Sequence, residues 1–357
     1  MDLRFYNGKK VFITGHTGFK GSWMCQALVG AGAKVTGYAL EPPTKPALFE
    51  LLRLSEHMRS VNGDVRDYDK MLKTIKECRP EFVIHMAAQP LVRESYQRPA
   101  YTYETNVMGT VNILESIRNT DSVRSFVNVT TDKVYLNREW EWGYRENEEL
   151  NGYDPYSNSK SCSELVTSSY RQCFFAKENI AISTVRAGNV IGGGDFAADR
   201  IIPDCVRAVE ANEKIIIRNP ESIRPYQHVL EPVMAYLMIA RKQGGKKSFE
   251  GAYNVGPEEG SCITTGKMTA LFCRKWKEIS GMEPVWIEQG DGGPHEAGLL
   301  KLDPAKIKKV FGWRSVWGIE QTIEETADWY YHFLEKEDMR SYTEKQIQRY
   351  LIAEERT

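Results

Sequence analysis

A glycine-rich turn near the start of the chain constrains the fold more than any other feature. The β-rich run Lys10–Thr14 leads into Gly15, Gly18 and Gly21, and the helical stretch Ser22–Gly30 follows. Glycine permits a tight turn and lets the backbone approach a pyrophosphate closely, while the helix N-terminus offers free N–H groups and a positive dipole end. A glycine pattern alone is weak evidence. Its place at the first strand–turn–helix junction predicts a dinucleotide site rather than a plain turn.

The rest of the first half alternates apolar, strand-like runs with helical stretches. The strand candidates are residues 34–38, 82–86, 125–130 and 180–186, and Asn106–Arg118 carries apolar residues at helical spacing. Continuous apolar strands between helices indicate a parallel sheet that is covered on both faces. We therefore expect an α/β fold with a doubly wound, Rossmann-type sheet.

The length of 357 residues allows two lobes. We assign residues 1–186, with returning segments at about 225–252, to a dinucleotide-binding Rossmann domain. The strand–helix rhythm breaks after Arg186, so residues 187–335 are expected to form mainly a smaller, interleaved lobe of mixed α/β structure that binds the second ligand. The charged tail, residues 336–357, reads as a helix with a solvated ionic face.

Composition excludes several classes of function. The net charge of −1 gives no global basic field for nucleic acid. No stretch approaches the ~18 apolar residues of a membrane span, so the cytoplasm is the expected location. The seven cysteines are scattered without a CxxC pair, which argues against a disulfide framework and a cysteine-based zinc site.

The second strand does not decide between NAD and NADP. Enzymes that use NAD usually carry an acidic residue at the end of this strand, where it binds the ribose hydroxyls. Here Ala39 occupies that position, Glu41 is the nearest acid, and no arginine is present to favour a 2′-phosphate.

A tyrosine and a lysine four residues apart are the strongest catalytic candidates. Pro155 suits the start of a helix, and Tyr156 and Lys160 then share one helix face. A nearby ammonium and a positive nicotinamide ring would lower the tyrosine pKa from its usual value of about 10. The tyrosine could then accept a proton from a sugar hydroxyl as a hydride leaves. The alternative for this pair alone is a surface tyrosine beside a surface lysine.

Taken together, these motifs resemble the extended short-chain dehydrogenase/reductase family. The resemblance covers the chain to about residue 330 and is carried by Thr14–Gly21, Ala87–Gln89 and the Tyr156–Lys160 pair. Within the family, four segments resemble the 4,6-dehydratases that act on CDP-glucose: residues 15–23, 130–135, 186–195 and 224–229.

The resemblance implies NAD as the cofactor and a nucleotide sugar as the substrate. The cofactor contacts that it implies are Gly15, Thr17, Gly18, Phe19, Gly21, Asp64, Val65, Ala87, Ala88, Gln89, Asn106, Tyr156 and Lys160. Asn189 and Arg224 match residues that hold the diphosphate, a role that suits the forked arginine side chain. His228 is expected either to orient the substrate or to make a structural hydrogen bond.

Two charged residues distinguish dehydration from simple oxidation. The family match places Thr131 at the sugar 4-hydroxyl, and Asp132 and Lys133 follow it. Oxidation at carbon 4 acidifies the proton on carbon 5, so elimination of water needs a base there and an acid at the carbon 6 hydroxyl. Asp132 could be that acid if burial raised its pKa, and Lys133 the base if its pKa were depressed. In the resemblance, lysine after the aspartate marks CDP-linked substrates and glutamate marks thymidine-linked ones.

Other interpretations remain open at this stage. The chain could be another nucleotide-sugar 4,6-dehydratase, a nucleotide-sugar 4-epimerase, or an NAD-binding regulatory protein on a degenerate scaffold. Without partners at ligand spacing, His295 and Glu296 make a weak metal site, so we expect no metal, and His85 reads as a core histidine. The resemblance also implies a homodimer or dimer of dimers, formed through the helices of Asn106 and Tyr156, and precursors of dideoxysugars for lipopolysaccharide O-antigen.

Overall fold

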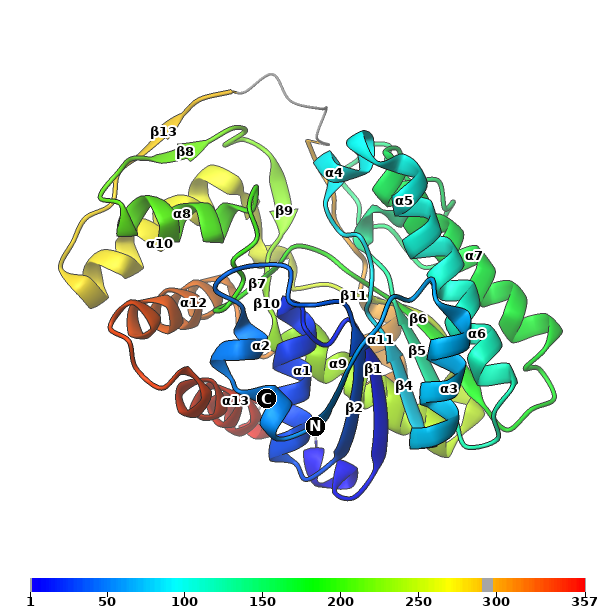
Figure 1. The fold of residues 1–357 in the computed structure, drawn as a ribbon. Coiled ribbons are helices and arrows are strands. Elements are labelled where there is room, and N and C mark those ends of the chain that lie inside the picture. Colours follow the sequence, from blue (N-terminus) through cyan, green and yellow to red (C-terminus); the bar gives the residue numbers. More distant parts are fainter. Residues whose placement is uncertain (1, 291–297, 357) are drawn as a thin grey trace.

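A seven-stranded parallel sheet forms the centre of the computed structural model, which describes residues 2–290 and 298–356 (Figure 1). Its strands are β1 (Lys10–Thr14), β2 (Lys34–Ala39), β3 (Arg59–Asn62), β4 (Phe82–His85), β5 (Ser125–Val129), β6 (Ala181–Ala187) and β11 (Gly251–Val255). The spatial order is β11-β6-β5-β4-β1-β2-β3, and every neighbouring pair is parallel. The predicted doubly wound, Rossmann-type fold is therefore confirmed.

Helices cover both faces of this sheet, as the apolar strands require. One face carries α3 (Tyr68–Cys78), α6 (Gly109–Arg118) and α7 (Pro155–Cys173) (Figure 1). The short helices α4 (Val92–Gln97) and α5 (Pro99–Tyr103) come between α3 and α6 in the chain. The other face carries α1 (Phe19–Gly30) and α9 (Leu230–Gly245). Because all strands run in parallel, their carboxyl ends meet at one edge, where ligands bind in folds of this kind.

The part of the chain beyond β6 builds a second group of elements beside the sheet. It includes the helices α8 (Ile201–Glu210), α10 (Thr265–Ser280), α11 (Ala305–Phe311) and α12 (Ile319–Leu334). Three two-stranded pairs join them: β7 (Val190–Ile191) with β10 (Gln227–His228), β9 (Ile223–Pro225) with β12 (Cys262–Thr264), and β8 (Ile215–Ile217) with β13 (Trp286–Glu288). The helix α9 and the strand β11 return to the main sheet between these pieces.

Within the described residues, no helix has the length and apolar character needed to cross a membrane. All seven cysteines are free thiols.

The charged tail is helical, as the sequence predicts, but one of its faces is buried. The helix α13 (Met339–Arg356) packs on α1 and α12. Its Tyr350 hydroxyl donates to Glu231 Oε2 of α9 at 2.8 Å, while Glu231 Oε1 accepts the backbone N–H groups of Val316 and Trp317 at 2.9 and 2.7 Å. Burial raises the pKa of Glu231 to about 7. The tail therefore ties α1 and α9, the two helices on one face of the sheet, to the second group of elements.

We predict that Tyr350→Phe destabilises the chain. The change leaves a fully buried carboxylate without one of its three donors, which costs about 1–3 kcal/mol of unfolding free energy. Urea unfolding measures the loss, with Tyr153→Phe as the control because Tyr153 is 84% exposed. Equal midpoints for the two variants would show that the tail contributes no such anchor.

Candidate functional site

The glycine turn after β1 has room for a ligand on one side and none on the other. Gly15 has a φ of +77°, and a Cβ there would lie 2.7 Å from the backbone nitrogen of Ala87. A Cβ on Gly21 would lie 2.2 Å from the carbonyl oxygen of Gly15. For Gly18, which caps α1, the nearest atom is 3.5 Å away. Gly15 and Gly21 thus serve close packing within the protein, whereas Gly18 leaves the loop open at the positive end of α1.

Asp64 and Val65, predicted to contact adenine, follow β3, and both side chains make contacts within the protein. The Asp64 carboxylate accepts bonds from the backbone and side chain of Arg66, which lower its pKa. Val65 is buried against Gly109. At the end of β2, Glu41 accepts a bond from Asn62 at 2.5 Å, so an acid does lie near the expected ribose position, and the choice between NAD and NADP stays open at this residue.

The loop after β4 is held by an amide that makes all its bonds within the protein. Asn106 Oδ1 accepts the backbone N–H of Gln89 at 2.8 Å, and Asn106 Nδ2 donates to the Gln89 carbonyl and to Ser159 Oγ at 3.1 and 2.9 Å. Asn106 lies in a π-helical segment, Glu104–Met108. Any contribution of Asn106 to cofactor binding therefore acts through the loop of Ala87, Ala88 and Gln89, which it joins to α7.

The predicted catalytic residues come together where β5 ends and α7 begins. Thr131 and Asp132 follow β5 and are buried, and the Thr131 hydroxyl donates to Asp132 Oδ1 at 2.9 Å. The Tyr156 phenol interacts with the Thr131 side chain, and Lys160 Nζ donates to the Val129 carbonyl at 3.1 Å. Asp154 caps α7 by accepting the Ser157 N–H, which fixes the first turn that carries Tyr156.

Burial dominates the acid–base properties of this cluster. It raises the pKa of Asp132, whose Oδ2 is enclosed without a hydrogen-bond partner among the described residues. Burial, followed by the charge of Lys20, lowers the pKa of Lys160 to about 7. Burial thus shifts the pKa of Asp132 in the direction that a proton donor needs, and half-buried Lys133 follows it directly.

The expectation for Tyr156 needs a correction. The protein itself raises the pKa of Tyr156 to about 12, because burial outweighs the opposing effects of Thr131 and Arg200. The net effect of the protein's own groups is therefore opposite to the lowering expected from the sequence, and an oxidised nicotinamide ring is a cation that would act in the expected direction.

Two cations that lie near the catalytic cluster, Lys20 and Arg200, were not among the site residues predicted from the sequence. Half-buried Lys20 of the glycine turn has its pKa lowered to about 8 by burial and by Arg200, while Asp132 and Asp195 act in the opposite direction. Arg200, just before α8, donates to Asp195 Oδ2 at 2.8 Å and acts on the pKa of Tyr156. A positive charge inside the glycine motif could have identified Lys20 from the sequence. Arg200 is distant in sequence from the motifs, and no sequence feature pointed to it.

The predicted substrate residues have different surroundings. Asn189 lies between β6 and β7, with its side chain half-buried. Arg224 of β9 lies close enough to Asp132 to lower its pKa. His228 is fully buried between Trp23 and Trp317, with ring centroids 5.8 and 4.8 Å away, and its Nδ1 accepts the Leu230 N–H. For His228 the geometry supports the structural alternative.

Two other histidines were considered in the sequence, His85 and His295. His85 is buried and bonds to Thr14 Oγ1 at 2.7 Å, which confirms the predicted core histidine. His295 and Glu296 lie outside the described residues. Among the residues that are described, no group of three or more His, Cys, Asp or Glu could hold a metal ion.

Comparison with known proteins places this chain in a family. Residues 12–326 match the family model described as GDP-mannose 4,6 dehydratase. The chain is 47% identical over 99% of both lengths to a CDP-glucose 4,6-dehydratase of Salmonella typhimurium, and 26% identical to a human dTDP-D-glucose 4,6-dehydratase over 90% of each. A dTDP-glucose 4,6-dehydratase of Bacillus anthracis, solved with NAD, shares the fold with a TM-score of 0.74, 20% identity and coverage of 91% and 97% of the two chains.

We predict that alanine at Gly18 and at Gly21 has different effects. Gly21→Ala forces a Cβ onto the Gly15 carbonyl and should lower both stability and NAD binding. Gly18→Ala has space within the protein and should cost at most about 1 kcal/mol of stability as a weaker cap. It should still weaken NAD binding at least about tenfold, because the new methyl group occupies the side that a pyrophosphate approaches. Fluorescence titration with NAD and thermal unfolding measure both, and wild-type NAD affinity in Gly18→Ala would contradict the pyrophosphate assignment.

Proposed function

This chain belongs to the GDP-mannose 4,6-dehydratase family, and we propose that it converts CDP-D-glucose to CDP-4-dehydro-6-deoxy-D-glucose and water with NAD as cofactor. The observation that carries the proposal is the enclosed Asp132 carboxyl beside Thr131, Tyr156 and Lys160. An oxidation needs the last three residues, but only a dehydration needs a protonated acid next to them. The relative that is 47% identical along the whole chain supports CDP-glucose as the substrate.

The cofactor is held at the carboxyl edge of the sheet. The open face of Gly18 and the N-terminus of α1 suit a pyrophosphate, with Gly15, Thr17, Phe19 and Gly21 forming the rest of the loop. Asp64 and Val65 lie on the adenine side, and the loop of Ala87, Ala88 and Gln89 lies on the nicotinamide side. When bound there, NAD would supply the acceptor for the hydride of carbon 4 and the source of the hydride for carbon 6.

Tyr156 acts as the base of the oxidation. Its phenolate accepts the proton of the 4-hydroxyl, which Thr131 orients by a hydrogen bond. Lys160, with a pKa near 7, is partly protonated at neutral pH, and its ammonium stabilises the phenolate. Positive charge near Tyr156 counteracts the effect of burial on the phenol. Arg200 lowers its pKa, and the Lys160 ammonium and an oxidised ring would act in the same direction.

Asp132 and Lys133 carry out the elimination. Lys133 accepts the proton from carbon 5, the double bond forms between carbons 5 and 6, and the bond from carbon 6 to its hydroxyl breaks as Asp132 protonates the leaving oxygen. The raised pKa of Asp132 keeps this carboxyl protonated to a higher pH than usual. A proton returns to carbon 5 when the hydride reaches carbon 6, so the net change is the loss of one water.

The second ligand lies between the sheet edge and the later elements. Arg224, with Asn189, binds the diphosphate, and the effect of Arg224 on the pKa of nearby Asp132 supports a position beside the reacting sugar. In this proposal residues 1–186, with segments at about 225–252, bind the cofactor, and residues 187–335 mainly bind the nucleotide sugar. The product serves as a precursor of dideoxysugars for O-antigen.

The chain assembles as a homodimer, or as a dimer of dimers, through the surface of α7 and the segment from α4 to α6. Support for this comes from large apolar side chains that are exposed there, namely Tyr96, Tyr103, Met108 and Leu165. Large apolar side chains that are exposed on neighbouring helices are typical of an interface when they gather into one patch.

Product formation tests the proposed function. The purified chain is incubated with CDP-glucose or dTDP-glucose, with and without added NAD, and the 4-keto-6-deoxy product is measured by its absorbance after alkali. We expect product from CDP-glucose and much less from dTDP-glucose. Equal turnover of both sugars would contradict the CDP assignment, and an epimer without loss of water would contradict the dehydration.

We predict that Asp132→Asn separates oxidation from elimination. The amide keeps the shape of the carboxyl but cannot protonate the leaving hydroxyl, so dehydration should fall about 10²–10⁴-fold. Hydride removal should persist and appear as NADH absorbance after rapid mixing with substrate. Asp121→Asn, at an exposed position, is the control. Full dehydration by Asp132→Asn would remove Asp132 from the mechanism.

A further inference from the structure

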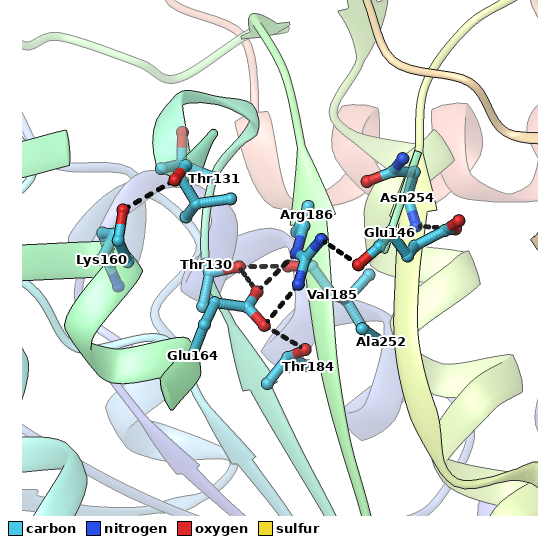
Figure 2. A network of polar contacts seen from close by, with 12 residues as sticks. Thr130, Thr131, Glu146, Lys160, Glu164, Thr184, Val185, Arg186, Ala252 and Asn254 are labelled. Carbon is cyan, nitrogen blue, oxygen red and sulfur yellow. Dashed lines mark hydrogen bonds and ion pairs between the residues drawn. The ribbon is translucent and has the colours of Figure 1, made fainter. Parts of the chain in front are cut away.

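A buried ion pair lies directly behind the catalytic cluster. Glu164 of α7 and Arg186 of β6 are each about 3% exposed and bond side by side, with Arg186 Nε and Nη2 donating to the two carboxylate oxygens at 2.9 and 3.0 Å. Figure 2 shows Glu164 facing Arg186, with Thr130 and Thr184 on either side. We call these four residues the Glu164 network.

The two threonines bond to the carboxylate in equivalent ways. Thr130 donates to Glu164 Oε1 and Thr184 donates to Glu164 Oε2, each at 2.6 Å (Figure 2). Each oxygen therefore accepts one threonine hydroxyl and one arginine N–H. The threonines differ in their surroundings. Thr130 precedes Thr131 of the catalytic cluster, and its hydroxyl also lies 3.3 Å from the Val185 carbonyl oxygen, whereas Thr184 lies within β6.

Three residues on α7 together hold the catalytic segment. Lys160 donates to the Val129 carbonyl, Glu164 accepts from Thr130, and Ser161 Oγ donates to the Val134 carbonyl at 2.7 Å. Residues 131–133, which carry the proposed chemistry, lie between these fixed points. Such contacts set the position of Thr131 and Asp132 relative to Tyr156, which is on the same helix.

The arginine extends this support beyond the segment. Arg186 Nη1 donates to the Tyr135 hydroxyl at 2.7 Å and to the Glu146 carbonyl at 3.1 Å. The Tyr135 hydroxyl in turn donates to Asn254 Oδ1 of β11 at 2.7 Å. The residue after Val134 is thus fixed to two strands of the sheet.

Stability alone does not account for a buried ion pair at this place. Removing two charges from water is costly, and well-packed apolar residues are often as stable or more stable. On the basis of the proposed dehydration, we propose that the Glu164 network positions the Thr131–Lys133 segment against Tyr156 and Lys160, and that the Glu164 carboxylate favours the charged form of Lys160. Glu164 and Arg186 touch no reacting atom in this account, so they are positioning residues.

The charge of Glu164 adds an electrostatic effect. Glu164 lies one helical turn after Lys160 and raises its pKa, against burial and the charge of Lys20, which lower it. Lys160 acts as an ammonium, so activity is present below its pKa and is lost as the pH rises through it. Without Glu164 that loss should occur at a lower pH.

A matched pair of variants tests the positioning role. Thr130→Val and Thr184→Val each remove one hydroxyl from the same carboxylate, and each oxygen keeps its arginine donor. We expect Thr130→Val to lower kcat about tenfold with KM for CDP-glucose nearly unchanged, because displacement of reacting groups by a fraction of an ångström slows the chemical steps. Thr184→Val should retain kcat at a similar melting temperature, and Thr130→Ser, which keeps the hydroxyl, should restore it.

Equal kcat values for the two valine variants would overturn the positioning role and leave only a structural one. Glu164→Gln provides a second readout, since the alkaline limb of its kcat–pH profile should move to lower pH, and an unmoved limb would refute the electrostatic part. All rates are taken relative to the wild-type chain. If the wild-type chain rejects CDP-glucose, the proposed function fails, and the comparison of variants is made with the nucleotide sugar that it does convert.

Discussion

The proposed chemistry of this chain depends on the contact between α7 and the carboxyl end of β5. The helix brings Tyr156 and Lys160, and the strand ends in Thr131 and Asp132. Neither the helix nor the strand carries all of these residues. Lys160, Ser161 and Glu164 of α7 bond to three points of the segment 129–134, so the packing of α7 on the sheet sets the geometry of the proposed active centre.

Burial acts on each group of this centre in the direction that its charge dictates. It raises the pKa of Asp132, which favours its proposed use as an acid, and lowers that of Lys160, which opposes its proposed use as an ammonium. The same burial raises the pKa of Tyr156, which opposes its use as a base. In the proposed mechanism, the burial that favours Asp132 as an acid therefore makes the tyrosine depend on neighbouring positive charge, which Arg200, Lys160 and an oxidised cofactor would supply.

Local patterns predicted much of the fold and part of the site. The glycine turn identified the first strand–helix unit, apolar runs identified most strands, and the spacing of Tyr156 and Lys160 predicted a shared helix face. Groups that approach only through the tertiary fold gave no signal, such as Arg200, or Glu164 and Arg186, whose pairing depends on the alignment of α7 against β6. In the tail, charge patterning did not predict burial. The sequence is rich in charged residues and was expected to face solvent, but Tyr342, Ile347 and Tyr350 form a buried face.

The fate of the hydrogen on carbon 4 tests the account most directly. CDP-glucose with deuterium at carbon 4 is converted by the chain, and the product is examined by mass spectrometry and NMR. Oxidation, elimination and hydride return at one site predict a product that has lost one water and carries the deuterium at carbon 6. A product that keeps the deuterium at carbon 4, or that has lost no water, would contradict the assignment of Tyr156, Asp132 and Lys133 to a dehydration.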